Sequence, residues 1–224
     1  MSSFLRNSPL SLLLSGQFEA FALSVLYLLP ALVIALSFHE AAHAWMADKM
    51  GDPTARNMGR VTLDPTKHID LFGFLAFLFI GFGWGKPVPT NPRNYYNYKK
   101  ANILVSLAGV TTNLILSFVF YLIFFIMFVT GLDIPILTTI ILNIVYMNIV
   151  LCFFNLIPIP PLDGHHLISG FIARKSPRFF MAYKQYGYYV LLAILVFTDL
   201  IQIALGFILN WVLILYNLFF GLFL

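Results

Sequence analysis

The feature that most constrains this chain is an uncharged stretch, residues 20–38, that runs without a turn residue into His39, Glu40 and His43. The stretch has about the length that a helix needs to cross the hydrocarbon core of a bilayer. Ionisable side chains on an apolar helix are costly in a membrane, so their presence there indicates a function. We therefore expect a transmembrane helix over residues 21–50, with a chemical site near its end.

The spacing of the three polar residues indicates what that chemistry is. His39 and His43 are four positions apart, so on a helix their imidazoles lie on one face and can hold the same cation. Glu40 lies about 100° further round the helix, close enough to act on a water beside the ion without ligating the ion. The pattern H-E-x-x-H is typical of two zinc ligands with a general base.

The composition extends the membrane assignment to the whole chain. Of the 224 residues, 60% are hydrophobic and 10% are charged, which is more apolar surface than a soluble domain of this size can bury. We predict an all-α polytopic membrane protein that forms a single domain, residues 1–224. Cys152 is the single cysteine, so neither a disulfide framework nor a cysteine zinc site is expected.

Five apolar segments can be drawn, over residues 20–38, 69–85, 101–132, 134–162 and 186–224. The second is short and rich in glycine, so we expect a re-entrant or β-hairpin segment on the cytoplasmic side rather than a span. The last is long enough for a helical hairpin, about residues 180–224, with Thr198-Asp199 or Asn210 as the break. The sequence thus predicts about five transmembrane helices.

The basic residues indicate which side of the membrane each connection occupies. They concentrate in residues 49–100 and 174–184, and connections rich in Lys and Arg are cytoplasmic. The histidines of the first helix would then lie near the cytoplasmic side of an integral, multi-pass protein, in a partly hydrated pocket. Because the basic residues follow this membrane pattern and form no patch, we expect no nucleic-acid partner.

A catalytic zinc site needs a third protein ligand, and Asp163 is the candidate. It directly follows the uncharged residues 134–162, where an aspartate is costly unless it is paired or bound to metal. Prolines at 158, 160 and 161 end the preceding helix, and Gly164 permits a sharp turn. A Pro-Asp-Gly cluster is also a common turn, but the H-E-x-x-H pattern on a parallel helix favours the ligand.

These motifs together resemble the site-2 protease family, zinc intramembrane metalloproteases that cleave transmembrane helices of other proteins. HEAAH (39–43) and the later NLIPIPPLDG (155–164) carry the resemblance, and it covers residues 21–171. GRVTLDPTKHID (59–70), GWGKPVPTNPR (83–93) and AGVTTN (108–113) match the compact subgroup that lacks PDZ and CBS domains.

The resemblance implies one zinc ion per chain, held by His39, His43 and Asp163, with Glu40 as the catalytic base. It also implies that Asn113 lies near the site and helps to hold the substrate or the developing oxyanion. The expected partners are a transmembrane protein substrate and the lipid bilayer, and the oligomeric state stays open.

Several alternatives remain open at this point. His68, His165 or His166 could contact the metal instead of serving as interface or solvated residues. A metal transporter, an inactive zinc-binding scaffold or a zinc hydrolase acting on lipids or small amides could use the same ligands. For the protease, residues 85–90 are our candidate for pairing with an unwound substrate strand, although Pro87 and Pro89 lack a backbone donor.

Overall fold

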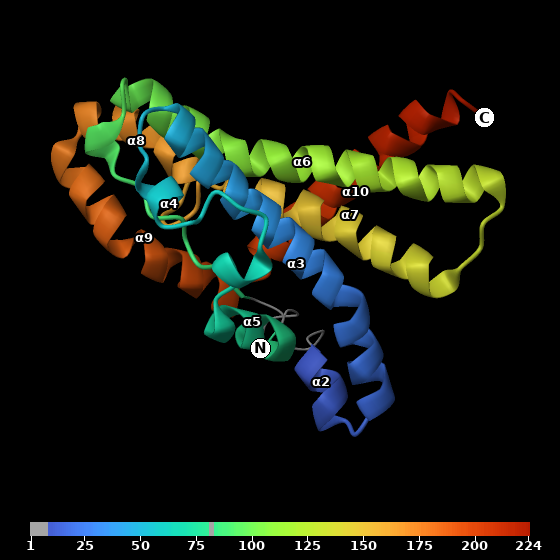
Figure 1. The fold of residues 1–224 in the computed structure, drawn as a ribbon. Helices are drawn as coiled ribbons and strands as arrows, with labels where there is room; N and C mark the ends of the chain where they lie inside the picture. The colour runs from blue at the N-terminus through green and yellow to red at the C-terminus, as the bar shows by residue number, and fades with distance from the viewer. Residues whose placement is uncertain (1–8, 81–82) are drawn as a thin grey trace.

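The computed structural model describes residues 9–80 and 83–224, and the regular secondary structure of this part of the chain is helical, apart from one isolated β-bridge (Figure 1). Two short 3₁₀ turns, η1 (Pro65–Lys67) and η2 (Pro92–Asn94), lie in the connections. The α-helices are α2 (Pro9–Leu14), α3 (Phe18–Lys49), α4 (Thr54–Asn57), α5 (Leu71–Ile80), α6 (Tyr98–Thr130), α7 (Pro135–Asn155), α8 (Gly164–Lys175), α9 (Pro177–Phe197) and α10 (Leu200–Gly221).

Five of these helices, α3, α6, α7, α9 and α10, are long and apolar enough to cross a membrane. This confirms the predicted all-α polytopic fold with five transmembrane helices. The C-terminal hairpin breaks at Thr198 and Asp199, between α9 and α10, whereas the other candidate, Asn210, lies inside α10.

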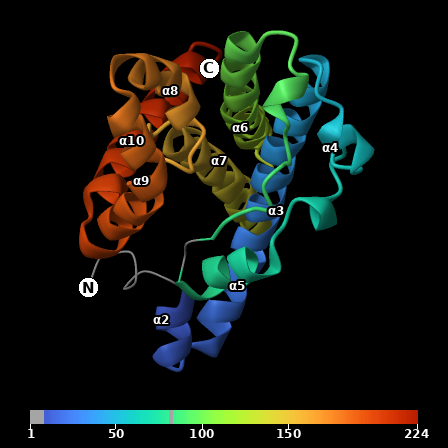
Figure 2. The ribbon, with the colours of Figure 1, turned by 90° about the vertical axis from the view of Figure 1, so that its left-hand side faces the viewer.

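Helices α3, α6 and α7 pack against one another at the centre of the bundle, as Figures 1 and 2 show. Small residues let helices approach closely in a membrane, and α3 has a buried ridge at a spacing of four, formed by Ala31, Ala35, His39, His43 and Ala47. The facing ridge of α6 contains Gly109, Asn113, Ser117 and Tyr121. The two histidines therefore lie within the contact between α3 and α6.

The predicted re-entrant segment contains a helix, α5, and its ends lie side by side. An isolated antiparallel bridge joins Ile69 to Gly85. A Cβ on Gly73 would lie 2.1 Å from the backbone oxygen of Trp84, so only glycine allows α5 to approach the returning chain this closely. Gly81, which belongs to the same segment, lies outside the described residues, and the depth of the segment in the membrane stays a prediction.

The buried carboxylate of Asp52 ties the end of α3 to the chain that returns from α5. It accepts hydrogen bonds from Thr54 N (3.1 Å) and Oγ1 (2.5 Å), from Asn91 N (2.6 Å) and from Asn94 Nδ2 (2.8 Å). Burial alone would raise the pKa of Asp52, but these donors outweigh it and lower the pKa below its usual value. The ionised carboxylate thus holds residues 91–94 against the end of α3.

Replacing Asp52 by Asn should destabilise this connection by about 2 kcal/mol, because hydrogen bonds to a buried charged group are lost. A lowered folded-state pKa stabilises the protein above the unfolded pKa, and this stabilisation is lost as the pH falls through the folded pKa. The difference in melting temperature between wild type and Asp52→Asn, measured in detergent, should therefore be largest at pH 7 and decrease below about pH 4.

Asp64→Asn is the matched control for this experiment. Asp64 accepts from Thr66 N and Thr66 Oγ1 in the same way but is exposed. We expect little change in its melting temperature. Equal melting temperatures for all three proteins at pH 7 would contradict the role given to Asp52.

Candidate metal centre

Three of the residues identified in the sequence, His39, His43 and Asp163, meet at one point in the structure. Nε2 of His39 lies 3.0 Å from Nε2 of His43, and Oδ2 of Asp163 lies 3.2 Å and 3.1 Å from these two nitrogens. Both histidines are buried, and the side chain of Asp163 is 19% exposed. Among residues 9–80 and 83–224, these three form the group of ionisable side chains that could hold a metal ion.

The hydrogen bonds of the two imidazoles determine which ring nitrogens carry protons. Nδ1 of His39 lies 2.5 Å from Oδ1 of Asn113, and Nδ1 of His43 lies 2.7 Å from the carbonyl oxygen of Val105. Both partners are acceptors, so Nδ1 is the donor in each ring. In a neutral imidazole the other nitrogen, Nε2, then presents a lone pair. Both lone pairs point into the same small space.

The orientation of the Asn113 amide is fixed independently. Its Nδ2 donates to the carbonyl oxygen of Ala35 (3.1 Å) and to Oδ1 of Asn148 (2.8 Å), and Asn148 Nδ2 donates in turn to the carbonyl oxygen of Ile144 (2.8 Å). Oδ1 of Asn113 is therefore the atom that faces His39. Asn148 thus forms a hydrogen bond between helices, whereas Asn143 and Asn155 donate to carbonyls of their own helix.

Three acceptors thus converge without a donor between them. No group among the described residues makes a hydrogen bond of good geometry to Oδ2 of Asp163, although it is buried. Such an arrangement is unfavourable unless a cation neutralises it. Ligands at zinc bond lengths in a tetrahedron are about 3.3 Å apart, close to the 3.0–3.2 Å observed. The set of two imidazoles and one carboxylate therefore fits a tetrahedral ion with one open position.

The backbone of α6 is close behind the two rings, which explains a glycine at position 109. A Cβ on Gly109 would lie 2.5 Å from Nε2 of His43 and 2.7 Å from Cε1 of His39. Any larger residue would displace one or both imidazoles. Gly109 belongs to the AGVTTN motif, but the sequence alone does not show that its backbone contacts the histidines.

The loop after α7 brings Asp163 to the histidines. Successive turns run from Leu156 to Asp163, with Ile159 N donating to the carbonyl of Ile157 (2.8 Å) and Leu162 N to that of Ile159 (3.0 Å). A Cβ on Gly164 would lie 2.2 Å from the carbonyl oxygen of Leu156, so the compact loop requires glycine there. The loop thus positions the carboxylate at the start of α8.

Glu40 lies outside the group of three ligands, and its carboxylate is held by the returning chain. Oε2 of Glu40 accepts a hydrogen bond from Val88 N at 3.0 Å. On the other side of this segment, Lys86 N donates to the carbonyl of His68 (2.7 Å) and the buried Arg60 donates from Nη2 to the carbonyl of Lys86 (2.6 Å). Burial lowers the pKa of Arg60, while the charge of Glu40 opposes this shift.

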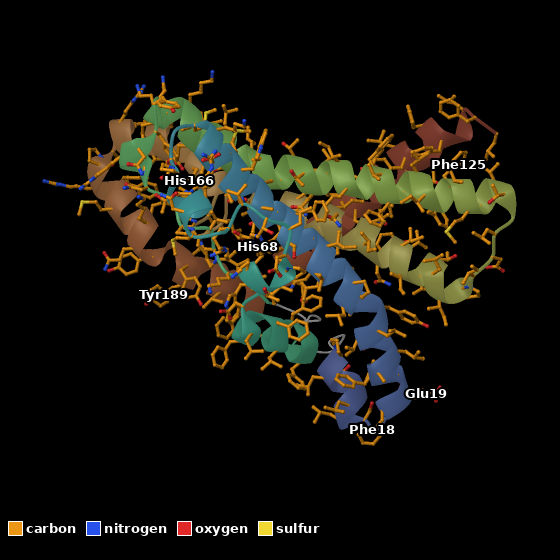
Figure 3. All side chains as sticks on the ribbon, viewed as in Figure 1. Phe18, Glu19, His68, Phe125, His166 and Tyr189 are labelled. Atoms are coloured by element: carbon orange, nitrogen blue, oxygen red, sulfur yellow. The ribbon has the colours of Figure 1, made fainter. Side chains whose placement is uncertain are left out.

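The three remaining histidines lie outside the group formed by His39, His43 and Asp163. His165 Nδ1 donates to the carbonyl of Leu162 (2.8 Å), and its ring is 3.7 Å from that of His166. Burial and the neighbouring His165 lower the pKa of His166 to about 4, so it is neutral at pH 7. The fully buried His68 contacts the carbonyl of Thr62 through Nε2. In Figure 3, His166 lies towards the end of the bundle with α8, His68 lies nearer the middle of the molecule, and Phe125 lies towards the opposite end.

Comparison with known proteins gives the chain a family. Residues 27–136 and 132–198 match the model of peptidase family M50. YwhC of Bacillus subtilis, which carries the provisional description of a zinc metalloprotease, is 37% identical over 175 residues, which cover 76% of this chain and 80% of YwhC.

More distant relatives carry the same provisional description. Rip2 of Mycobacterium tuberculosis is 29% identical over 72% of this chain, and Rip2 of Mycolicibacterium smegmatis is 26% identical over 73%. The matched region spans 63% and 64% of these two proteins. No solved structure matches the chain. On the family match and the identity to YwhC, the chain belongs to peptidase family M50, the site-2 protease family, and is an integral, multi-pass membrane protein.

Proposed function

We propose that this protein is a zinc-dependent endopeptidase that hydrolyses peptide bonds in transmembrane segments of substrate proteins. His39, His43 and Asp163 hold one zinc ion, and Glu40 is the general base. The observation that carries the proposal is the convergence of Nε2 of His39, Nε2 of His43 and Oδ2 of Asp163. These three atoms lie within 3.2 Å of one another, with no donor between them. The zinc metalloprotease description of YwhC supports the same metal and reaction.

The ion, when bound, polarises the scissile carbonyl and makes water a better nucleophile. Glu40 takes the proton of the attacking water and passes it to the leaving amine. The N–H of Val88 orients the Glu40 carboxylate. Asn113 and Val105 keep the two imidazoles in the tautomer that offers Nε2 to the ion. In this arrangement Asn113 acts through His39, and its contact with substrate or oxyanion stays a prediction.

A transmembrane substrate must unwind before cleavage, because its peptide groups are bonded within its own helix. Residues 85–90 remain our candidate for pairing with the unwound strand, but their donors are largely in use. Lys86 N and Val88 N are bonded to His68 and Glu40, and the two prolines have no N–H. Substrate would therefore pair mainly with the carbonyls. We place this chemistry near the cytoplasmic side, from the distribution of basic residues.

Glu40→Gln separates catalysis from metal binding. Gln keeps the size and the hydrogen bond from Val88 but cannot accept a proton, so cleavage of a designed single-span substrate in proteoliposomes should fall by about 10²–10⁴-fold. Zinc content, measured by mass spectrometry, should stay at one ion per chain. Full cleavage by the variant would contradict the role of Glu40 as the general base.

Gly109→Ala should disrupt the metal site without changing a ligand. The new methyl group displaces the imidazoles, and zinc affinity should fall by more than about tenfold. Gly170→Ala is the control, because a Cβ there meets nothing within 4 Å. Titration with a zinc-selective chelator measures both variants, and equal affinities would refute the close packing of α6 on the histidines.

Val88→Pro tests the hydrogen bond to Glu40. Proline removes the N–H, so cleavage should fall by about tenfold while zinc content stays unchanged. Val88→Ala keeps the N–H and should cleave like the wild type. If both variants cleave normally, the orientation of Glu40 does not depend on this contact.

A further inference from the structure

An apolar cavity of about 370 Å³ lies between α3 and α5 on one side and α9 and α10 on the other, with α7 contributing to its lining. Figure 2 shows α7 between α3 and the α9–α10 pair. The lining is aliphatic and aromatic, apart from Gln202 near the start of α10. The volume is within the range of sites that bind small ligands or side chains.

Leu36 connects this cavity to Glu40, the proposed general base. Leu36 lines the cavity and precedes Glu40 by four residues, so both side chains lie on the same face of α3. A Cβ on Gly85 would be 3.4 Å from Oε1 of Glu40 and 3.7 Å from Cδ2 of Leu36. A peptide segment bound at Glu40 can therefore place a side chain in the cavity.

The amide of Gln202 has no partner among the described residues, although its Oε1 and Nε2 are both buried. An unpaired buried amide is costly, and few other polar groups in this lining could hold a water beside it. A peptide group offers both a donor and an acceptor to such an amide, whereas a lipid acyl chain offers neither. The free amide therefore favours a polypeptide as occupant.

We propose that this cavity is a specificity subsite, which takes a bulky apolar side chain of the substrate's transmembrane segment while Gln202 hydrogen-bonds to a peptide group exposed by unwinding. The inference rests on the proposed function and specifies its substrate. The enzyme then selects segments that have a large apolar residue near the cleaved bond and that unwind there. Charged residues are rejected at this position because the lining offers no partner for them.

Gln202→Met tests the amide. Substrate binding is measured in the Glu40→Gln background, where cleavage does not interfere, with a fluorescent single-span peptide in lipid nanodiscs. The Gln202→Met change should weaken binding about tenfold, since the peptide group loses its partner. The melting temperature should stay the same or rise, because an unpaired buried amide is removed. Unchanged binding, or weaker binding with a lower melting temperature, would overturn the role of Gln202.

Gly206→Phe tests the cavity. Gly206 lines the cavity, and a Cβ there meets nothing within 4 Å, so the new ring can fill the space. Gly221→Phe is the matched control on the same helix, since Gly221 is equally open but lies outside the cavity lining. Gly206→Phe should lower kcat/KM at least tenfold for a substrate with Leu or Phe near the cleaved bond and much less for one with Ala. Equal losses for all substrates, or no loss, would overturn the subsite.

A lipid acyl chain is the alternative occupant. In that case Gly206→Phe would reduce the lipid that copurifies with the protein, as seen by native mass spectrometry, and leave cleavage unchanged, which overturns the proposal. If the proposed function itself is wrong, the result is different: the zinc-loaded wild type would cleave no transmembrane substrate. Equal cleavage by wild type and Gly206→Phe overturns the subsite alone.

Discussion

The structure of the candidate metal centre depends on one electrostatic constraint: three hydrogen-bond acceptors meet inside the helical bundle. His39 and His43 donate through Nδ1 to Asn113 and to the carbonyl of Val105, so their Nε2 lone pairs face Oδ2 of Asp163. Without a cation these atoms repel one another. The packing of α3, α6 and α7 holds them together, so a cation at this point would stabilise the centre of the bundle as well as supply chemistry.

The parts of the site that depend on local geometry could be predicted from the sequence. The spacing of His39 and His43 fixes one face of a helix whatever surrounds it, and Glu40 follows from the same geometry. Asp163 required a topological argument, because it lies 120 residues after His43, and the structure brings it to the histidines. The five membrane helices followed from the lengths of the uncharged segments.

What could not be predicted depends on contacts between distant segments. The AGVTTN motif indicated that Asn113 lies near the site, but its hydrogen bond to His39 and the contact of Gly109 with both imidazoles depend on how α6 is placed against α3. The hydrogen bond from Val88 to Glu40 depends on the path of the chain after α5. A glycine-rich apolar run also does not reveal that most of it forms the helix α5, since helix and strand patterns are ambiguous in short apolar segments.

The most direct test of the proposed metal centre is the coordination of zinc in the purified wild-type protein, measured by X-ray absorption spectroscopy. We predict one zinc ion per chain with four nitrogen or oxygen ligands at about 2.0–2.1 Å, two of them imidazoles. Protein that binds no zinc after metal loading, or zinc whose spectrum shows fewer than two imidazoles, would mean that the three acceptors are not a metal centre.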